Sequence, residues 1–192
     1  MNDAYRRISI HGVRETLLEK QAKSIGIELL KVRMPQTLSM EEYDKIMTAQ
    51  MSAIKSEGIN VSIFGDIFLE DIRNYRESAS RRQNFKAAFP LWKKDVRELA
   101  HEFISLGFKA IVACVDGSKL SKEFVGKELD EEFIANLPQN VCPCGENGEY
   151  HTFVFDGPIF NEKIDFKINE IVEREFPANE GKKYVYHYCD LE

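Results

Sequence analysis

The chain has 192 residues, 43% of them hydrophobic and 30% charged, a globular composition that suits one core or two small lobes around a cleft. Its formal net charge of −6 argues against a nucleic-acid partner, because a phosphate backbone is bound by clustered Lys and Arg. Four cysteines make no disulfide scaffold, and neither a membrane span nor a signal peptide is recognised, so we expect a cytoplasmic protein with reduced thiols and no membrane partner.

The first third of the chain predicts helices that alternate with short apolar strands. Apolar residues at helical spacing predict a helix from Val13 to Ile25, which Gly26 ends. The run from Ile27 to Val32 predicts a buried strand. Ser39 suits the N-cap of a helix over residues 41–55.

A second short strand is expected from Asn60 to Phe64, followed by a helix from Leu69 to about Arg82. The strands of this region lack strict polar alternation, which favours a parallel sheet buried on both faces. Residues 89–92, with the sequence F-P-L-W, predict a short extended segment.

The second half of the chain predicts a helix over 95–106, an apolar strand over 108–115 and a short helix over 128–135. Residues 138–149 are rich in Pro, Gly, Asn and Cys and predict an ordered loop before a strand over 151–155. Apolar residues alternate with polar ones in 164–168 and 184–188, which indicates half-exposed, antiparallel strands. We therefore predict an α/β fold with a parallel lobe over 1–92 and a mixed lobe over 93–192.

The loop over 142–152 is the strongest candidate site. It carries two carboxylates, an amide, an imidazole, a hydroxyl and two thiols, and its glycines permit close backbone approach to a ligand. The alternative is a tight hairpin whose acidic groups are merely solvated. Cys142 and Cys144 form a C-x-C pair without a second spaced pair, so we expect structural or free thiols and no metal site. Residues 116–119 are interpreted only as a turn.

Two further segments are candidates. Gly65 and Asp66 follow a predicted strand and precede a helix, where open α/β sheets bind ligands, although Asp66 could instead cap the helix. Glu70 and Arg73 could form only a surface pair. Near the start, His11 and Arg14 flank a helix N-terminus that would welcome an anion, although Arg14 could equally pair with Glu15 or Glu19.

Four motifs in a fixed order resemble one known family. They are R-I-S-I-H-G-V-R at 7–14, F-G-D-I-F-L-E-D-I-R at 64–73, F-P-L-W at 89–92 and P-C-G-E-N-G-E-Y-H-T at 143–152. Together they resemble the diphthine–ammonia ligase-like family of ATP-binding proteins, within the PP-loop ATP pyrophosphatases, over about residues 5–168. The resemblance implies a Rossmann-like (PP-loop/HUP-type) nucleotide lobe, here truncated, and a C-terminal mixed α/β substrate lobe.

The resemblance also implies a reaction. ATP is split to AMP and pyrophosphate, a carboxylate acceptor is adenylated, and ammonia then forms an amide, with Mg²⁺ and backbone amides holding the pyrophosphate charge. The residues carried over are catalytic Glu146, Glu149 and His151; nucleotide-binding His11, Gly12, Arg14, Gly65 and Asp66; and substrate-binding Arg73, Cys144, Gly145, Asn147, Gly148 and Thr152. Glu149 or His151 would act as general base.

Two departures from the family pattern bear on function. The S-G-G-x-D-S loop is not found, so the sequence begins where a second strand is expected, and a misassigned start, a truncated sequence or a partner that supplies the loop would each account for it. Its absence keeps open a non-catalytic binding protein or an inactive fragment, and a homodimer that covers an exposed sheet edge.

The second departure lies in the acceptor motif. The diphthamide branch shows E-G-G-E-[FY]-E-[TS], whereas this chain has Asn147 and His151 in E-N-G-E-Y-H-T. A bacterial branch with this variant is linked to cobalamin salvage. The resemblance therefore implies a small-molecule carboxylate, such as a cobalamin-related compound, rather than a modified histidine of elongation factor 2, and it leaves the nitrogen donor open.

Overall fold

The computed structural model describes residues 1, 6–35, 38–177 and 183–192, and it confirms the predicted α/β fold. The chain forms two compact units, one of Met1–Lys31 with Val96–Glu192 and one of Val32–Asp95. Residues 1–31 thus pack with the second half of the chain, whereas the sequence analysis placed them in the first lobe. The assignment of a nucleotide-binding lobe to residues 1–92 and a substrate lobe to residues 93–192 stays a prediction.

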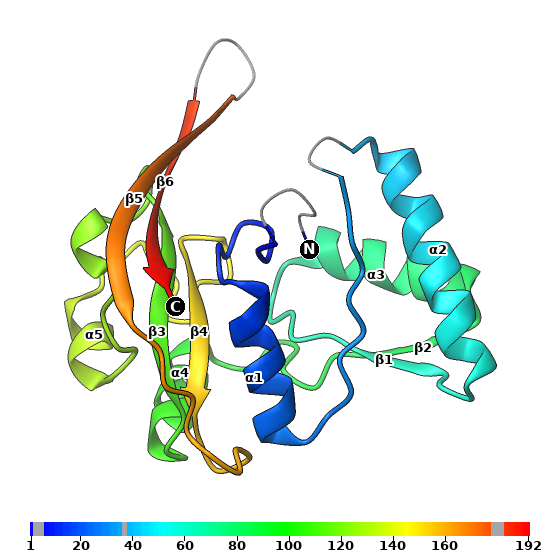
Figure 1. The fold of residues 1–192 in the computed structure, drawn as a ribbon, viewed down its shortest axis with the longest axis horizontal. Helices are drawn as coiled ribbons and strands as arrows, with labels where there is room; N and C mark the ends of the chain where they lie inside the picture. The colour runs from blue at the N-terminus through cyan, green and yellow to red at the C-terminus, as the bar shows by residue number, and fades with distance from the viewer. Residues whose placement is uncertain (2–5, 36–37, 178–182) are drawn as a thin grey trace. The chain divides into compact units, whose positions relative to one another are not determined.

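The larger unit is built on a four-stranded antiparallel sheet with the strand order β4-β3-β6-β5 (Figure 1). The strands are β3 (Lys109–Asp116), β4 (Tyr150–Asp156), β5 (Ile168–Pro177) and β6 (Lys183–Leu191). Every residue of β3 after Lys109 is buried, which explains its continuous apolar run. The half-exposed, antiparallel strand predicted for residues 184–188 is confirmed in β6, but the strand predicted around residue 164 begins only at Ile168.

Both faces of the sheet are covered by other parts of the unit at β3 and β4, whereas β5 is almost entirely exposed. Its helices are α1 (Glu15–Ile25), α4 (Val96–Ser105), the short 3₁₀ helix η1 (Lys122–Phe124) and α5 (Glu131–Asn136). Consecutive residues of a strand point to opposite faces. Tyr150 packs edge-on against Phe133 of α5, whereas His151 stacks on His11 of the segment before α1. The N-terminal segment and α5 therefore lie on opposite faces.

The smaller unit contains α2 (Met40–Ser56), β1 (Val61–Ile63), α3 (Glu70–Arg82) and β2 (Lys86–Ala88). The Ser39 cap is confirmed: Oγ of Ser39 accepts from the Glu42 amide at 3.2 Å, and Oε2 of Glu42 accepts from the Ser39 amide at 2.9 Å. Strands β1 and β2 pair in parallel, as predicted. The predicted burial of both faces is wrong, because Ile63 is 72% exposed in this structure.

Two local predictions are also wrong. Residues 27–32 form no strand, and Ile27 and Leu30 are exposed. An apolar run becomes a strand only where another strand accepts its backbone hydrogen bonds, and the described residues offer none beside it. Residues 89–92 turn after β2 instead of forming the extended segment themselves. None of the helices in the described part of the chain is long and apolar enough to cross a bilayer.

Candidate functional site

The loop between α5 and β4 is organised around the buried carboxylate of Glu149. Its Oε1 accepts from the Cys142 amide at 2.9 Å and from Nδ2 of Asn147 at 3.0 Å, and its Oε2 accepts from the Asn147 amide at 2.9 Å. Both oxygens are thus engaged by the loop itself. This geometry favours a structural role for Glu149, and its predicted role as a base stays a prediction.

Gly145 is required by the path of the same loop. Its φ is +65°, and an added Cβ would lie 2.7 Å from the carbonyl oxygen of Tyr150. Cys144, next to it, donates from Sγ to the carbonyl of Val96 at 3.2 Å. The glycine turn and the buried carboxylate together fix the backbone from which His151 emerges.

His151 forms a stacked pair with His11. Their ring centroids are 4.4 Å apart with 28° between the planes, and both side chains are half-buried. Burial lowers the pKa of His11, although a hydrogen bond to the backbone of Thr152 opposes this. Burial, with smaller contributions from His11 and Lys119, lowers the pKa of His151 to about 4. Both imidazoles are therefore neutral near pH 7.

Lys119, which follows β3, lies close enough to His151 to lower its pKa. Nζ of Lys119 donates to the carbonyl of Asn147 at 2.7 Å and lies 3.4 Å from Oδ2 of Asp116. Oδ1 of the buried Asp116 accepts from the amide and the hydroxyl of Ser118 at 3.0 and 2.7 Å. The sequence analysis treated residues 116–119 only as a turn. Their place at the end of a buried strand was the signal that could have marked them as site residues.

Cys114 of β3 lies between His151 of β4 and Tyr188 of β6, with which it is paired in the sheet. Burial raises the pKa of both Cys114 and Tyr188, that of Cys114 to about 12. Gly12 lies against the Tyr188 ring, since an added Cβ would be 2.5 Å from its Cδ1. The predicted nucleotide residue Gly12 thus lies over a tyrosine in this unit.

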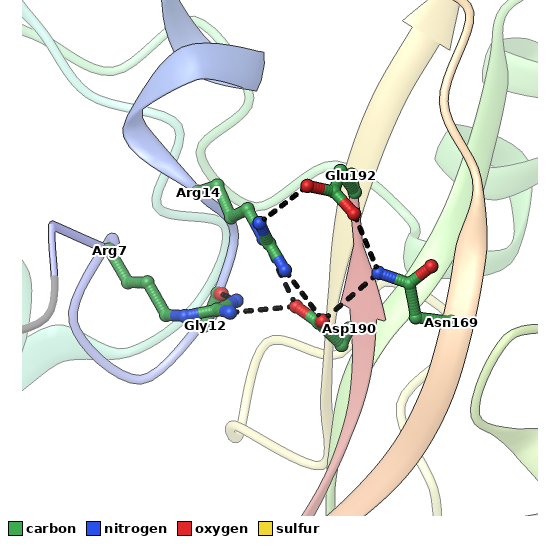
Figure 2. A network of polar contacts seen from close by, with 6 residues as sticks. All are labelled: Arg7, Gly12, Arg14, Asn169, Asp190 and Glu192. Atoms are coloured by element: carbon green, nitrogen blue, oxygen red, sulfur yellow. Dashed lines mark hydrogen bonds and ion pairs between the residues drawn. The ribbon is translucent and has the colours of Figure 1, made fainter.

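Two arginines of the N-terminal segment bind the carboxylates at the end of β6 (Figure 2). Arg14 donates to Asp190 from Nη2 at 2.7 Å and from Nε at 3.2 Å, and to Glu192 from Nη1 at 3.1 Å. Arg7 donates from Nη2 to Oδ1 of Asp190 at 2.7 Å, and Asn169 donates to both carboxylates. We call these five residues the Asp190 network. Hydrogen bonds from Arg14 hold the pKa of Asp190 well below its usual range.

The Asp190 network holds the turn that carries His11. Nη1 of Arg7 donates to the Gly12 carbonyl at 2.7 Å (Figure 2). The backbones of Arg7 and Arg14 also form an isolated antiparallel β-bridge across the turn. Within the turn, Ile10 has a φ of +60°, which is strained for a β-branched residue. The partners of Arg14 are therefore distant acids rather than Glu15 or Glu19, and its predicted contact with nucleotide stays a prediction.

The predicted residues of the smaller unit lie where β1 ends. Gly65 is exposed, with no atom within 4 Å of an added Cβ. Oδ2 of Asp66 forms an ion pair with Nε of Arg76, at a distance of 2.8 Å. Both atoms are buried, and the angles between them do not meet the requirements of a hydrogen bond. Glu70 contacts Lys93 at 3.4 Å, so the suggested pairing with Arg73 is not the one observed.

The structure gathers most of the predicted residues in the larger unit. These are His11, Gly12, Arg14, Cys144, Gly145, Glu146, Asn147, Gly148, Glu149, His151 and Thr152, whereas Gly65, Asp66 and Arg73 belong to the smaller one. The four thiols form no disulfide. Within the described ranges, no three His, Cys, Asp or Glu side chains are grouped to hold a metal ion.

Comparison with known proteins follows the second half of the chain. Residues 95–190 match the family described as diphthamide synthase C-terminal domain. The diphthine–ammonia ligase of Schizosaccharomyces pombe is 34% identical over 101 residues, which are 50% of this chain and 17% of that protein. The diphthine–ammonia ligase of Bos taurus is 34% identical over 64% of this chain and 46% of its own length. That of Homo sapiens is 34% identical over 60% of this chain and 44% of its own length. The aligned regions thus span less than half the length of these relatives.

Proposed function

Because this chain belongs to the diphthamide synthase family, we propose that it acts as an ATP-dependent ligase that forms an amide. In the proposed reaction, a carboxylate attacks the α-phosphate of ATP and releases pyrophosphate. Ammonia then attacks the acyl adenylate, so that an amide, AMP and a proton leave. The larger unit binds the acceptor, and the residues at the end of β1 bind nucleotide.

The stacked pair of His11 and His151 is the observation that carries the assignment of the acceptor site. A neutral imidazole donates from one ring nitrogen and accepts at the other, so the pair can bind an acceptor without adding charge. The Lys119 ammonium lies close enough to lower the pKa of His151, and it supplies a positive charge that would attract a carboxylate.

The low pKa of His151 also decides which role suits it. A general base works best when its pKa lies near the working pH, and a pKa of about 4 is far below neutrality. We therefore assign His151 to binding and orienting the acceptor rather than to removing a proton from ammonia. In the family pattern a Glu stands here, so the His of this chain removes a negative charge that would repel a carboxylate.

The nucleotide-binding proposal is supported by the open end of β1. The exposed Gly65 leaves room for a ligand close to the backbone, and the buried Oδ2 of Asp66 makes an ion pair with Arg76 but no hydrogen bond. Mg²⁺ is commonly bound by one or two carboxylates together with substrate phosphates, so Asp66 fits an ion that arrives with ATP. ATP would supply the adenylating group, and Asp66 would hold a ribose hydroxyl or the ion.

The His for Glu exchange also bears on the identity of the acceptor. We propose a small-molecule carboxylate, such as a cobalamin-related compound with free carboxyl groups. Diphthine, after which these relatives are named, is the competing acceptor.

The test is an exchange assay that follows radioactive pyrophosphate into ATP, which reports adenylation without ammonia. The 192-residue chain is incubated with ATP, Mg²⁺ and either a cobalamin precursor with free carboxylates or a diphthine-bearing protein. We expect exchange that depends on the carboxylate, and with hydroxylamine a hydroxamate in place of the amide. His151→Asn should raise the concentration of acceptor needed for half-maximal exchange about tenfold, since it removes a hydrogen bond in a half-buried site.

The matched control is His101→Asn, which changes an exposed histidine of α4 that pairs with Glu131. It should leave the exchange unchanged. Acceptor binding without exchange would support the alternative of a non-catalytic binding protein. Failure to bind either acceptor, with normal folding, would contradict the assignment of the His11–His151 pair.

A further inference from the structure

The smaller unit contains a stack of arginines and aromatic rings at the carboxyl ends of its two strands. Phe64 follows β1 and Phe89 follows β2, and their rings stack at 5.3 Å between centroids. The guanidinium of Arg76 lies 4.8 Å from the Phe64 ring, and that of Arg73 lies 4.8 Å from the Phe89 ring. Ligands of open α/β sheets gather at this end of parallel strands.

Arg73 is held firmly within this stack. Its guanidinium lies 4.5 Å from the Trp92 ring as well, and its Nε donates to Oε1 of Glu77 at 2.7 Å. A planar guanidinium that is stacked and bonded at Nε keeps two Nη groups in a fixed fork. In the described part of the chain, neither Nη group of Arg73 makes a hydrogen bond within the protein, and the side chain is 31% exposed.

The fork borders a cleft of about 310 Å³ lined by Glu70, Arg73, Asn74, Glu77 and Trp92. This volume lies at the lower end of the range for small-molecule sites. Its ionic groups balance, because Glu77 pairs with Arg73 and Glu70 with Lys93. A polyphosphate would bring several negative charges beside two carboxylates, whereas one carboxylate adds a single charge and matches the fork in shape.

We propose that this cleft binds the carboxylate of a small molecule, with both oxygens accepting from the Nη groups of Arg73 and the remainder lying against Trp92 and Asn74. The site is independent of the acceptor site at the His11–His151 pair, and it requires no ATP. The resemblance implied only that Arg73 binds substrate, and this proposal gives it a carboxylate ligand in a defined cleft of the smaller unit.

The chain has a single tryptophan, so the emission of Trp92 reports on this cleft directly. The 192-residue protein is titrated, at constant ionic strength and without nucleotide, with succinamate, which has one carboxylate, and with succinamide, its neutral amide. We expect a saturable change with succinamate and none with succinamide. Inorganic phosphate and pyrophosphate should bind more weakly than succinamate.

Arg73→Lys keeps the charge but loses the fork, and it should weaken succinamate binding at least fivefold. Arg81→Lys, an exposed position on the same helix, is the matched control and should bind within twofold of the wild type. Equal responses to succinamate and succinamide, or tighter binding of pyrophosphate, would overturn the proposal. So would unchanged binding by Arg73→Lys. Circular dichroism checks the fold, and the ligand comparison on the wild type does not depend on either variant.

Discussion

Replacing Asp190 by Asn would weaken the contacts that hold the N-terminal turn on the sheet. The carboxylate accepts from Arg7 and Arg14 at 2.7 Å each, from Nε of Arg14 at 3.2 Å and from Asn169 at 3.2 Å. An amide of the same shape removes the charge and presents a donor to the guanidinium donors. Hydrogen bonds to charged groups contribute about 1.5–3 kcal/mol each when buried.

That magnitude must be reduced here, because the Arg7 and Arg14 side chains are about one-third exposed and can recover water when the charge is lost. We expect Asp190→Asn to lower the free energy of unfolding of the larger unit by about 2 kcal/mol. The turn should also lose its hold on His11, and the pKa of His151 should then rise towards the ordinary value of about 6.5 as burial decreases.

The measurement is amide hydrogen exchange over residues 6–25 and 183–192, because the single tryptophan lies in the other unit and would not report on this one. Asp165→Asn, at an exposed position of the same unit, is the control. The pKa of Asp190 is lowered in the fold, so its contribution is present above the unfolded value of about 3.9 and is lost as the pH falls below it. The difference between wild type and variant should therefore shrink below about pH 4. A difference under about 0.5 kcal/mol at pH 7 would refute this reasoning.

Two further predictions concern the loop and the histidine pair. Gly145→Ala should destabilise the protein by about 2 kcal/mol or more in thermal unfolding, because it combines a positive φ with a clash against the Tyr150 carbonyl. Gly148→Ala, with a positive φ but open space, should cost only about 1 kcal/mol, and equal losses would contradict the clash. The His151 imidazole should titrate near pH 4 by NMR, and His11→Gln should raise that pKa. Since the folded pKa lies below the unfolded value of about 6.5, stability should fall as the pH drops from about 6.5 to 4, and a titration near 6.5 in the wild type would contradict the buried pair.

Local sequence was sufficient wherever the deciding contacts are close in the chain. The Ser39 cap needs only Glu42, three residues away, and Ser39 was recognised from its residue type and its place before the helix. The end of α1 needs only Gly26 with its φ of +80°. The apolar run of β3 predicted a buried strand because nothing else buries so many consecutive residues, and the glycines of the 142–152 loop predicted ordered turns.

Tertiary structure decided whatever depends on partners far along the chain. Residues 27–32 have the apolar pattern of a strand, but the pattern does not show whether another strand is available to pair with them. No strand in the described part of the chain lies beside them. Arg14 was predicted to bind an anion beside a helix N-terminus, but in the structure it binds Asp190, which is 176 residues away in the chain. Glu149 was predicted as a general base, and only the fold shows that both of its carboxylate oxygens accept hydrogen bonds within its own loop.

The candidate site illustrates the same division. The sequence alone predicted that His151 belongs to a candidate site next to glycine turns and that His11 precedes a helix, because glycine turns and helix starts are local features. Only the fold could place the rings of His11 and His151, which are 140 positions apart in the chain, at 4.4 Å from each other, with burial that keeps both neutral. Desolvation depends on what surrounds a group in space, and no pattern of neighbouring residues in the chain specifies that.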